Sequence, residues 1–228
     1  MKKRIFFRIL KILKKNLAYF ANSYFRKSFI KSRAKNENVC LQKCETTKIL
    51  RNTLIVLIGS ILLALSSKFK IPFYPVPMTM QTFVVLLLGV AFGWKIAFGT
   101  ICLYLFEGAI GLPVFSGTPE KGIGLTYMFG PTAGYLFGFL VASYLAGIFN
   151  YDDIFRKSIF FFFLNYIKLL FCVSFIYFFG LVWLGTLIGW DKPIFDLGAK
   201  PFLLAESFKL LILSLVSGKV FKLRNLSW

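Results

Sequence analysis

The sequence predicts an all-α protein: an integral membrane bundle of six transmembrane helices with a basic amphipathic N-terminal extension. Of its 228 residues, 57% are hydrophobic and 19% aromatic, and the mean hydropathy is +0.72. Ordinary soluble domains are only about 45–50% apolar. Several apolar segments approach the roughly 20 residues that a membrane span needs. The chain has no His, which excludes His-ligated metal centres and Ser–His or Cys–His nucleophile pairs.

Residues 1–48 are predicted to form a basic extension at the cytoplasmic membrane surface. Residues 1–51 contain 15 of the 28 basic residues and two of the nine acidic ones. Arg4, Arg8 and Lys11 recur at helical spacing opposite isoleucines, which is typical of a helix lying in the interface. Anionic lipid headgroups are the expected partner, not nucleic acid. A transit peptide and a start codon assigned too far upstream remain alternatives.

Residues 49–222 are predicted to form the membrane domain. Its six spans are expected at about 50–67, 80–94, 96–112, 131–149, 158–188 and 201–218. The fifth is long and is expected to tilt or break near Gly180 to Gly189.

Two long loops separate these spans. Three prolines in 68–79 cannot continue a helix, so we expect a structured, re-entrant loop on the extracytoplasmic side. Residues 113–130 are rich in Gly and Pro but too apolar for a plain solvated linker.

The distribution of Lys and Arg indicates that both termini are cytoplasmic. With six spans, 21 basic residues fall on the cytoplasmic side and five on the other, while Lys168 and Lys209 lie within spans. The positive-inside rule therefore orients the chain. Without residues 1–51, the excess of basic residues on the cytoplasmic side is small.

Small residues recur at a spacing of four along the fourth span, which aligns them on one helix face. They are Gly130, Gly134, Gly138, Ala142 and Ala146. Such a face lets another helix approach closely. Ser60 and Ala64 repeat the pattern in the first span. Packing within the bundle and docking of a partner subunit both explain these patterns.

Four ionisable residues lie inside the predicted spans, where a charge costs at least a few kcal/mol. Glu206 and Lys209 are three residues apart and share a helix face. They form either a structural ion pair or a polar clamp for a small ligand. Glu107 is expected to face water near the end of its helix, and Lys168 to reach the interface.

The sequence contains no recognisable catalytic or metal-binding constellation. It lacks a Walker A motif. Its four Cys lack CxxC spacing, so they are interpreted as apolar or spare residues. We expect no enzymatic activity, no metal and no cofactor in this chain.

Five stretches resemble the BioY family, the biotin-binding S components of energy-coupling factor transporters. They are IPFYPVPMTMQT at 71–82, GAIGLPVFSG at 108–117, GPTAGY at 130–135, IYFFGLVWL at 176–184 and PFLLAESFK at 201–209. Ala205 and Glu206 stand where the family usually has Gly and Asp. Ala133 replaces a usual Gly, and TPEK at 118–121 replaces small residues.

The resemblance implies a biotin site. Glu206 would accept hydrogen bonds from the ureido N–H groups, and Lys209 would donate to the ureido oxygen or the acidic tail. Two loops would close over the pocket, where glycines permit close backbone approach. The loop residues are Pro113, Phe115, Ser116, Gly117, Gly130, Pro131, Thr132 and Tyr135.

The resemblance also implies partners. A transmembrane coupling subunit and ATPase subunits, which would bind ATP, would drive biotin uptake across the cytoplasmic membrane. Small residues of the first helix, here Ser60 and Ala64, contact the coupling subunit in related S components. The alternatives are a stand-alone carrier of biotin or a related compound, a membrane-embedded lipid enzyme, and a purely structural membrane subunit. The scattered single acids disfavour the enzyme, and the Glu206/Lys209 pair disfavours the structural subunit.

The orientation predicts where two thiols react. Cys40 and Cys44 should be labelled by a membrane-impermeant thiol reagent only after the cytoplasmic face is opened, because their segment lies inside. Labelling of these two residues in intact cells would contradict the assignment of cytoplasmic termini.

Overall fold

The computed structural model describes residues 45–72, 74–118, 122–152 and 159–226. The chain divides into two compact units, Met1–Leu50 and Arg51–Trp228. Nearly all of the predicted extension at 1–48 lies outside the described residues, so its boundary and its interfacial helix stay predictions. The helix Glu45–Lys68 runs across the boundary between the units, and the other described elements all belong to the second unit.

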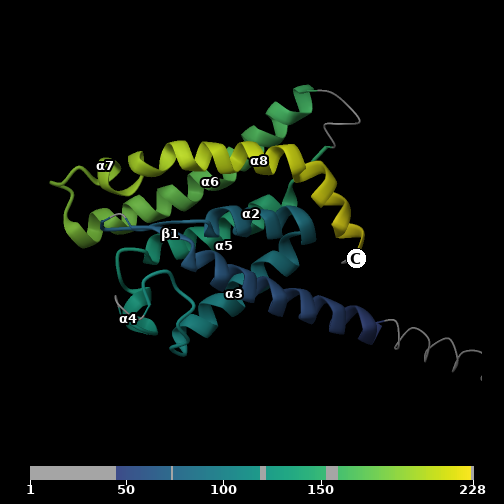
Figure 1. Ribbon diagram of the computed structural model, residues 1–228, viewed down its shortest axis with the longest axis horizontal. Helices are drawn as coiled ribbons and strands as arrows, with labels where there is room; N and C mark the ends of the chain where they lie inside the picture. Colours follow the sequence, from purple (N-terminus) through teal and green to yellow (C-terminus); the bar gives the residue numbers. More distant parts are fainter. Residues whose placement is uncertain (1–44, 73, 119–121, 153–158, 227–228) are drawn as a thin grey trace, which may run out of the picture. The chain divides into compact units, whose positions relative to one another are not determined.

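The structure is mostly helical (Figure 1), and each of the six predicted spans overlaps one of its main helices. These helices are Glu45–Lys68, α2 (Gln81–Phe92), α3 (Trp94–Ala109), α5 (Ala133–Ile148), α6 (Ile159–Ile188) and α8 (Leu203–Phe221). Within the described part of the chain, three helical segments are long and apolar enough to cross a membrane: Glu45–Lys68, Ile159–Ile188 and Ile194–Arg224. Gln81–Phe92 and Ala133–Ile148 are shorter apolar helices. A helical membrane fold is therefore confirmed, whereas six crossings remain a prediction.

The loops contain short elements that hydropathy did not indicate. The proline-rich segment forms an antiparallel hairpin, β1 (Lys70–Ile71) with β2 (Met78–Thr79), in which Lys70 pairs with Thr79. The Gly-rich segment contains α4 (Leu125–Met128). Short elements also flank α8. They are α7 (Ile194–Gly198), η1 (Lys200–Phe202) and η2 (Lys222–Leu226).

Helix α6 passes Gly180 without a break and ends at Ile188, just before Gly189, whereas the predicted tilt of this span stays a prediction. Gly180 instead lets the ring of Tyr135 approach: an added Cβ would lie 2.4 Å from that ring. Of the glycines between 180 and 189, only Gly189, with φ at +93°, adopts a conformation that L-residues avoid, and it follows the end of the helix.

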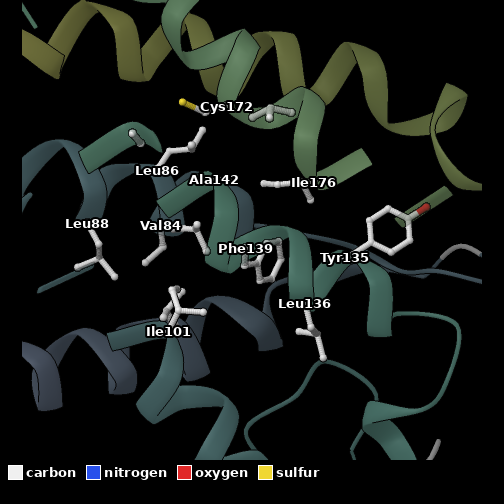
Figure 2. Packing of buried hydrophobic residues seen from close by; sticks show 14 of the residues in the cluster. Val84, Leu86, Leu88, Ile101, Tyr135, Leu136, Phe139, Ala142, Cys172 and Ile176 are labelled. Atoms are coloured by element: carbon white, nitrogen blue, oxygen red, sulfur yellow. The ribbon is translucent and has the colours of Figure 1, made fainter. Parts of the chain in front are cut away.

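Helix α5 packs against α2, α3 and α6. Its small residues face neighbouring helices of the same chain: an added Cβ would lie 2.3 Å from the Phe179 carbonyl oxygen at Gly134 and 2.6 Å from the Ile176 Cα at Gly138. Figure 2 shows Ala142, Phe139 and Ile176 in this core. The stripe therefore serves packing within the bundle.

Arg224, after α8, ties together the C-terminal ends of α2 and α5. Its Nε donates to the Val90 carbonyl at 3.1 Å, and its Nη2 to the carbonyls of Gly89 at 3.1 Å and Ala146 at 3.3 Å. A guanidinium suits these carbonyls because the carbonyl end of a helix carries partial negative charge; the Gly89 carbonyl also accepts from the Gly93 backbone N–H at 3.0 Å. This end of the bundle is therefore closed.

The close packing of α5 on α6 predicts a selective effect of one methyl group. Gly138→Ala should lower the unfolding free energy by about 1–3 kcal/mol, because the new Cβ meets backbone that cannot move aside. Gly99→Ala is the matched control, since its Cβ would meet nothing closer than 4.0 Å. Thermal unfolding in detergent measures both, and equal stability of the two variants would contradict the packing.

Candidate functional site

A cavity lies among the hairpin, the loop before α4, and parts of α2, α5, α6 and α8. Its empty volume is about 560 Å³, which includes space open to solvent at its mouth. Its lining is Val76, Pro77, Met78, Thr79, Gln81, Thr82, Phe115, Ser116, Tyr127, Thr132, Tyr135, Leu136, Phe139, Ile176, Tyr177, Phe202 and Glu206.

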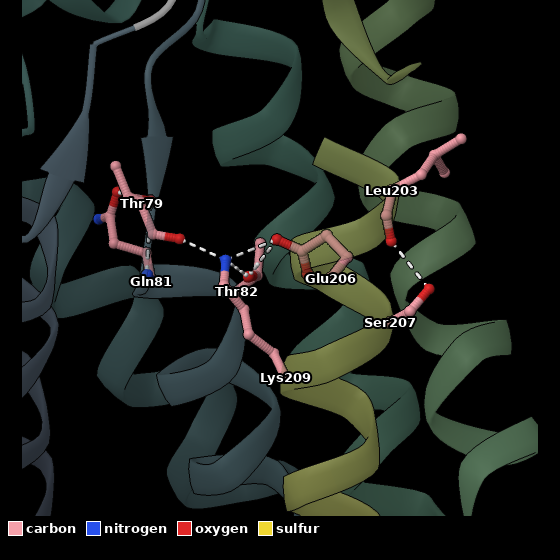
Figure 3. Close-up of polar contacts among 7 residues, drawn as sticks. All are labelled: Thr79, Gln81, Thr82, Leu203, Glu206, Ser207 and Lys209. Carbon is pink, nitrogen blue, oxygen red and sulfur yellow. Dashed lines mark hydrogen bonds and ion pairs between the residues drawn. The ribbon is translucent and has the colours of Figure 1, made fainter. Parts of the chain in front are cut away.

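A buried ion pair on α8 forms the charged part of the site (Figure 3). Lys209 Nζ lies 2.7 Å from Glu206 Oε1, and the two side chains are only 7% and 6% exposed. The Thr82 hydroxyl donates to the same carboxylate oxygen at 2.9 Å and accepts from Lys209 at 3.2 Å. The i,i+3 spacing thus produces the pairing that the sequence predicted.

Glu206 keeps one carboxylate oxygen without a partner. Oε2 is buried and accepts no hydrogen bond in the described part of the chain, although Glu206 lines the cavity. A buried acceptor left unpaired costs about 1–3 kcal/mol or more. A ligand N–H or O–H group in the cavity would remove this cost, because a carboxylate is a strong acceptor.

Lys209 points away from the cavity toward the hairpin and α2. It donates to the Thr79 carbonyl at 2.6 Å, to Thr82 and to Glu206. An ammonium has three donors, and these bonds use them all. In this arrangement Lys209 holds Glu206 and the hairpin in place, and its direct donation to a ligand stays a prediction.

Aromatic rings supply much of the cavity wall. Phe115 is fully buried and stacks on Tyr127, with ring centroids 4.9 Å apart. Tyr104 meets the Phe115 ring edge-on at 5.4 Å. Gly108 provides the slot, because an added Cβ would overlap the Phe115 ring at 2.0 Å. The opposite wall carries Tyr135, Phe139, Tyr177 and Phe202.

Side chains from three helices hold the loop that carries Phe115. Ser67 donates to the Val114 carbonyl at 2.6 Å, and Lys68 donates to that of Phe115 at 3.1 Å. The Tyr104 hydroxyl donates to Val114 at 3.2 Å and accepts from the Gln81 side chain at 2.6 Å. The loop is therefore fixed to the end of the first long helix and to the cavity wall.

The predicted site residues divide between the cavity lining and its surroundings. Glu206, Phe115, Ser116, Thr132 and Tyr135 line the cavity, whereas Lys209, Pro113, Gly117, Gly130 and Pro131 do not.

Gly130 and Pro113 illustrate why the predicted glycines and prolines do not line the cavity. The Gly130 carbonyl instead accepts from the Trp183 indole at 2.9 Å, and Pro113 is exposed. The glycines and prolines shape the turns, and the side chains between them reach the cavity.

Several lining residues were not predicted as site residues from the sequence. The hairpin residues Val76 to Thr79, together with Gln81 and Thr82, belong to a motif that carries the family resemblance, but their hydropathy indicates only an outer loop and the start of a span. The others are Tyr127, Leu136, Phe139, Ile176, Tyr177 and Phe202. Ile176, Tyr177 and Phe202 also lie in stretches that carry the family resemblance. Hydropathy does not single out any of the six, because apolar residues occur on all sides of their helices.

Ser60 and Glu107 differ from their predicted settings, whereas the setting of Lys168 agrees with its prediction. Ser60 is fully buried and its hydroxyl donates to Glu107, at 2.7 and 2.8 Å from the two oxygens. This structure therefore does not present Ser60 to a partner, and only Ala64, half-buried, keeps that expectation open. Glu107 is half-buried against this serine and is not simply facing water. Lys168 donates to the Asn150 carbonyl at 2.7 Å.

Comparison with known proteins identifies the family. A sequence model of the BioY family matches residues 35–225. A "Probable biotin transporter BioY" of Pyrococcus horikoshii is 32% identical over 65% of this chain and 82% of its own length. "Biotin transporter BioY2" of Lactococcus lactis subsp. cremoris is 34% identical over 75% of this chain and 90% of its own length.

A solved structure shares the fold. It is the crystal structure of "the S-component for biotin from an ECF-type ABC transporter", with a TM-score of 0.60 and 23% identity. The match covers 78% of this chain and 92% of the other.

The buried pair predicts a stability pattern. Lys209→Met should lower the unfolding free energy by about 3–5 kcal/mol, because it leaves Glu206 charged and uncompensated. Adding Glu206→Leu should recover most of this loss. Thermal unfolding of the purified single and double variants tests it, and a double variant no more stable than Lys209→Met would contradict the pairing.

Proposed function

We infer that this chain, which belongs to the BioY family, is a biotin-binding membrane protein and the uptake subunit of an energy-coupling factor transporter. The observation that carries this proposal is the free Oε2 of Glu206, a buried acceptor beside an aromatic-walled cavity. Several curated members of the family are named as biotin transporters, so biotin is the ligand against which the cavity is judged.

The chemistry of biotin matches the cavity in two respects. Its ureido ring offers N–H donors, and Glu206 Oε2 would accept one of them. Its bicyclic body is mostly apolar and would lie among Phe115, Tyr127, Tyr177 and the other rings of the wall. Polar groups of Gln81, Thr79 and Ser116 supply further hydrogen-bonding partners around it.

We further propose that the six main helices all cross the cytoplasmic membrane, with both termini inside. The excess of basic residues on one side supports this orientation. Helix α2 has 12 residues, which span about 18 Å at 1.5 Å per residue. That is less than the hydrocarbon core of about 30 Å, so the adjoining loops must complete the crossing within the bundle.

Energy for uptake would come from partners. The sequence contains no P-loop through which the chain could bind ATP. A transmembrane coupling subunit and ATPase subunits would assemble with it, as the S-component fold suggests. In this proposal the chain binds substrate and catalyses no reaction.

Titration of the purified chain with biotin tests the proposal. Glu206→Gln should weaken binding about 10- to 100-fold, because a hydrogen bond to a charged acceptor contributes about 1.5–3 kcal/mol. Glu206→Asp should be tolerated better, since it keeps the charge. Ser207→Ala is the matched control: its hydroxyl bonds the Leu203 carbonyl at 2.8 Å outside the cavity (Figure 3). Equal affinity of Glu206→Gln and wild type would contradict the proposed role of Glu206.

A further inference from the structure

Glu107 on α3 is an acid within the bundle that bonds a serine rather than a cation. Its two carboxylate oxygens lie 2.7 and 2.8 Å from the hydroxyl oxygen of Ser60. That hydroxyl has one proton, so it satisfies a single acceptor position of the roughly four that a carboxylate has. Among the described residues, no ion pair involves Glu107, whereas Glu206 has Lys209.

Through Ser60 the carboxylate contacts the middle of the apolar helix Glu45–Lys68, although Glu107 lies two residues before the end of α3. Ser60 is near the middle of the stretch between Arg51 and Lys68, the nearest charged residues on its helix. At 1.5 Å per residue it is roughly 12–14 Å from each along the helix axis. A charge at such a depth costs at least a few kcal/mol unless it is paired.

The surroundings of Glu107 are apolar and open to the outside of the bundle. Glu107 itself is half-buried. Exposed apolar side chains flank it on α3 and on the helix Glu45–Lys68. They include Ile61, Leu65, Phe106 and Ile110, which are 56–66% exposed. Ala64, small and half-buried, lies one turn beyond Ser60. A helix could therefore pack closely beside the carboxylate.

We propose that Glu107 is the polar anchor of a subunit interface, paired with a Lys or Arg on a transmembrane helix of the coupling subunit. A cation is the complementary partner, because a neutral hydroxyl from Ser60 does not compensate the charge. A second copy of this chain fits less well. Its intramembrane lysines, Lys168 and Lys209, already bond the Asn150 carbonyl and Glu206. The proposal rests on the proposed function, since it names the partner of that transporter.

The pairing divides the roles of the neighbouring residues. Ser60 is fully buried and orients the carboxylate from within the chain. The part of the Glu107 carboxylate that Ser60 does not cover is left to bond the partner subunit. Glu107 does not line the cavity, so assembly and ligand binding should respond separately to its substitution.

The test coexpresses the full chain with the coupling and ATPase subunits and measures two quantities for each variant. These are the amount of coupling subunit that copurifies from detergent and the biotin affinity of the solitary chain. Glu107→Gln should reduce assembly about 10-fold or more, and Glu107→Lys should abolish it. Glu107→Asp should retain part of it. Biotin affinity should stay within about two-fold in all three.

Two controls separate an interface from internal packing. Phe106→Leu changes a neighbouring exposed side chain without charge and should assemble normally. Ser60→Ala removes only the internal donor and should leave assembly within a few-fold of wild type. If Glu107 served the bundle alone, Ser60→Ala and Glu107→Gln would both lower the unfolding temperature of the solitary chain and leave assembly of the folded fraction unchanged.

Each remaining outcome has a defined meaning. Normal assembly of Glu107→Gln or Glu107→Lys would overturn the cationic partner. Absence of any copurifying coupling subunit with the wild-type chain would overturn the interface. Failure of the wild-type chain to bind biotin would count against the proposed function, and the assembly measurements would still decide the role of Glu107.

Discussion

The buried pair of Glu206 and Lys209 determines how the site is built. Two charges removed from water are stable only when each finds its counterpart and its remaining hydrogen bonds. Lys209 meets this requirement through Glu206, Thr82 and the Thr79 carbonyl, and in doing so it ties α8 to α2 and to β2. Glu206 meets it on one oxygen only. The arrangement thereby fixes the cavity wall and leaves a single strong acceptor for a ligand to satisfy.

The two ends of the bundle differ in how their helices and loops pack. At one end Arg224 satisfies carbonyls of both α2 and α5, and Gly89 lets α2 approach Ala146 of α5 closely. At the other end, near the hairpin and the Phe115 loop, a cavity remains. The loop is nevertheless held firmly, because Ser67, Lys68 and Tyr104 bond its carbonyls. The cavity is thus bounded by a loop that hydrogen bonds hold in place and by closely packed helices.

Much of the fold could be predicted from the sequence, but only part of the site. Apolar length located the six main helices, small residues at a spacing of four marked a helix face suited to close packing, and i,i+3 spacing placed Glu206 and Lys209 on one face of a helix. The hairpin could not be predicted, since its register joins residues that hydropathy does not relate. Tyr177 and Phe202 could not be assigned to the cavity either: when every face of a helix is apolar, periodicity does not indicate which one faces inward. The sequence also suggested a partner contact for Ser60, which is buried inside the bundle. A small residue suits an internal contact as well as an external one.

The central claim is that Glu206 Oε2 accepts a ureido N–H of biotin, and a comparison of two ligands tests it most directly. Wild type and Glu206→Gln would each be titrated with biotin and with a biotin methylated on the ureido nitrogens. The account predicts that wild type prefers biotin by about 10- to 100-fold, the loss expected for one charge-assisted hydrogen bond. It also predicts that Glu206→Gln loses most of this preference. An undiminished preference in Glu206→Gln would contradict it.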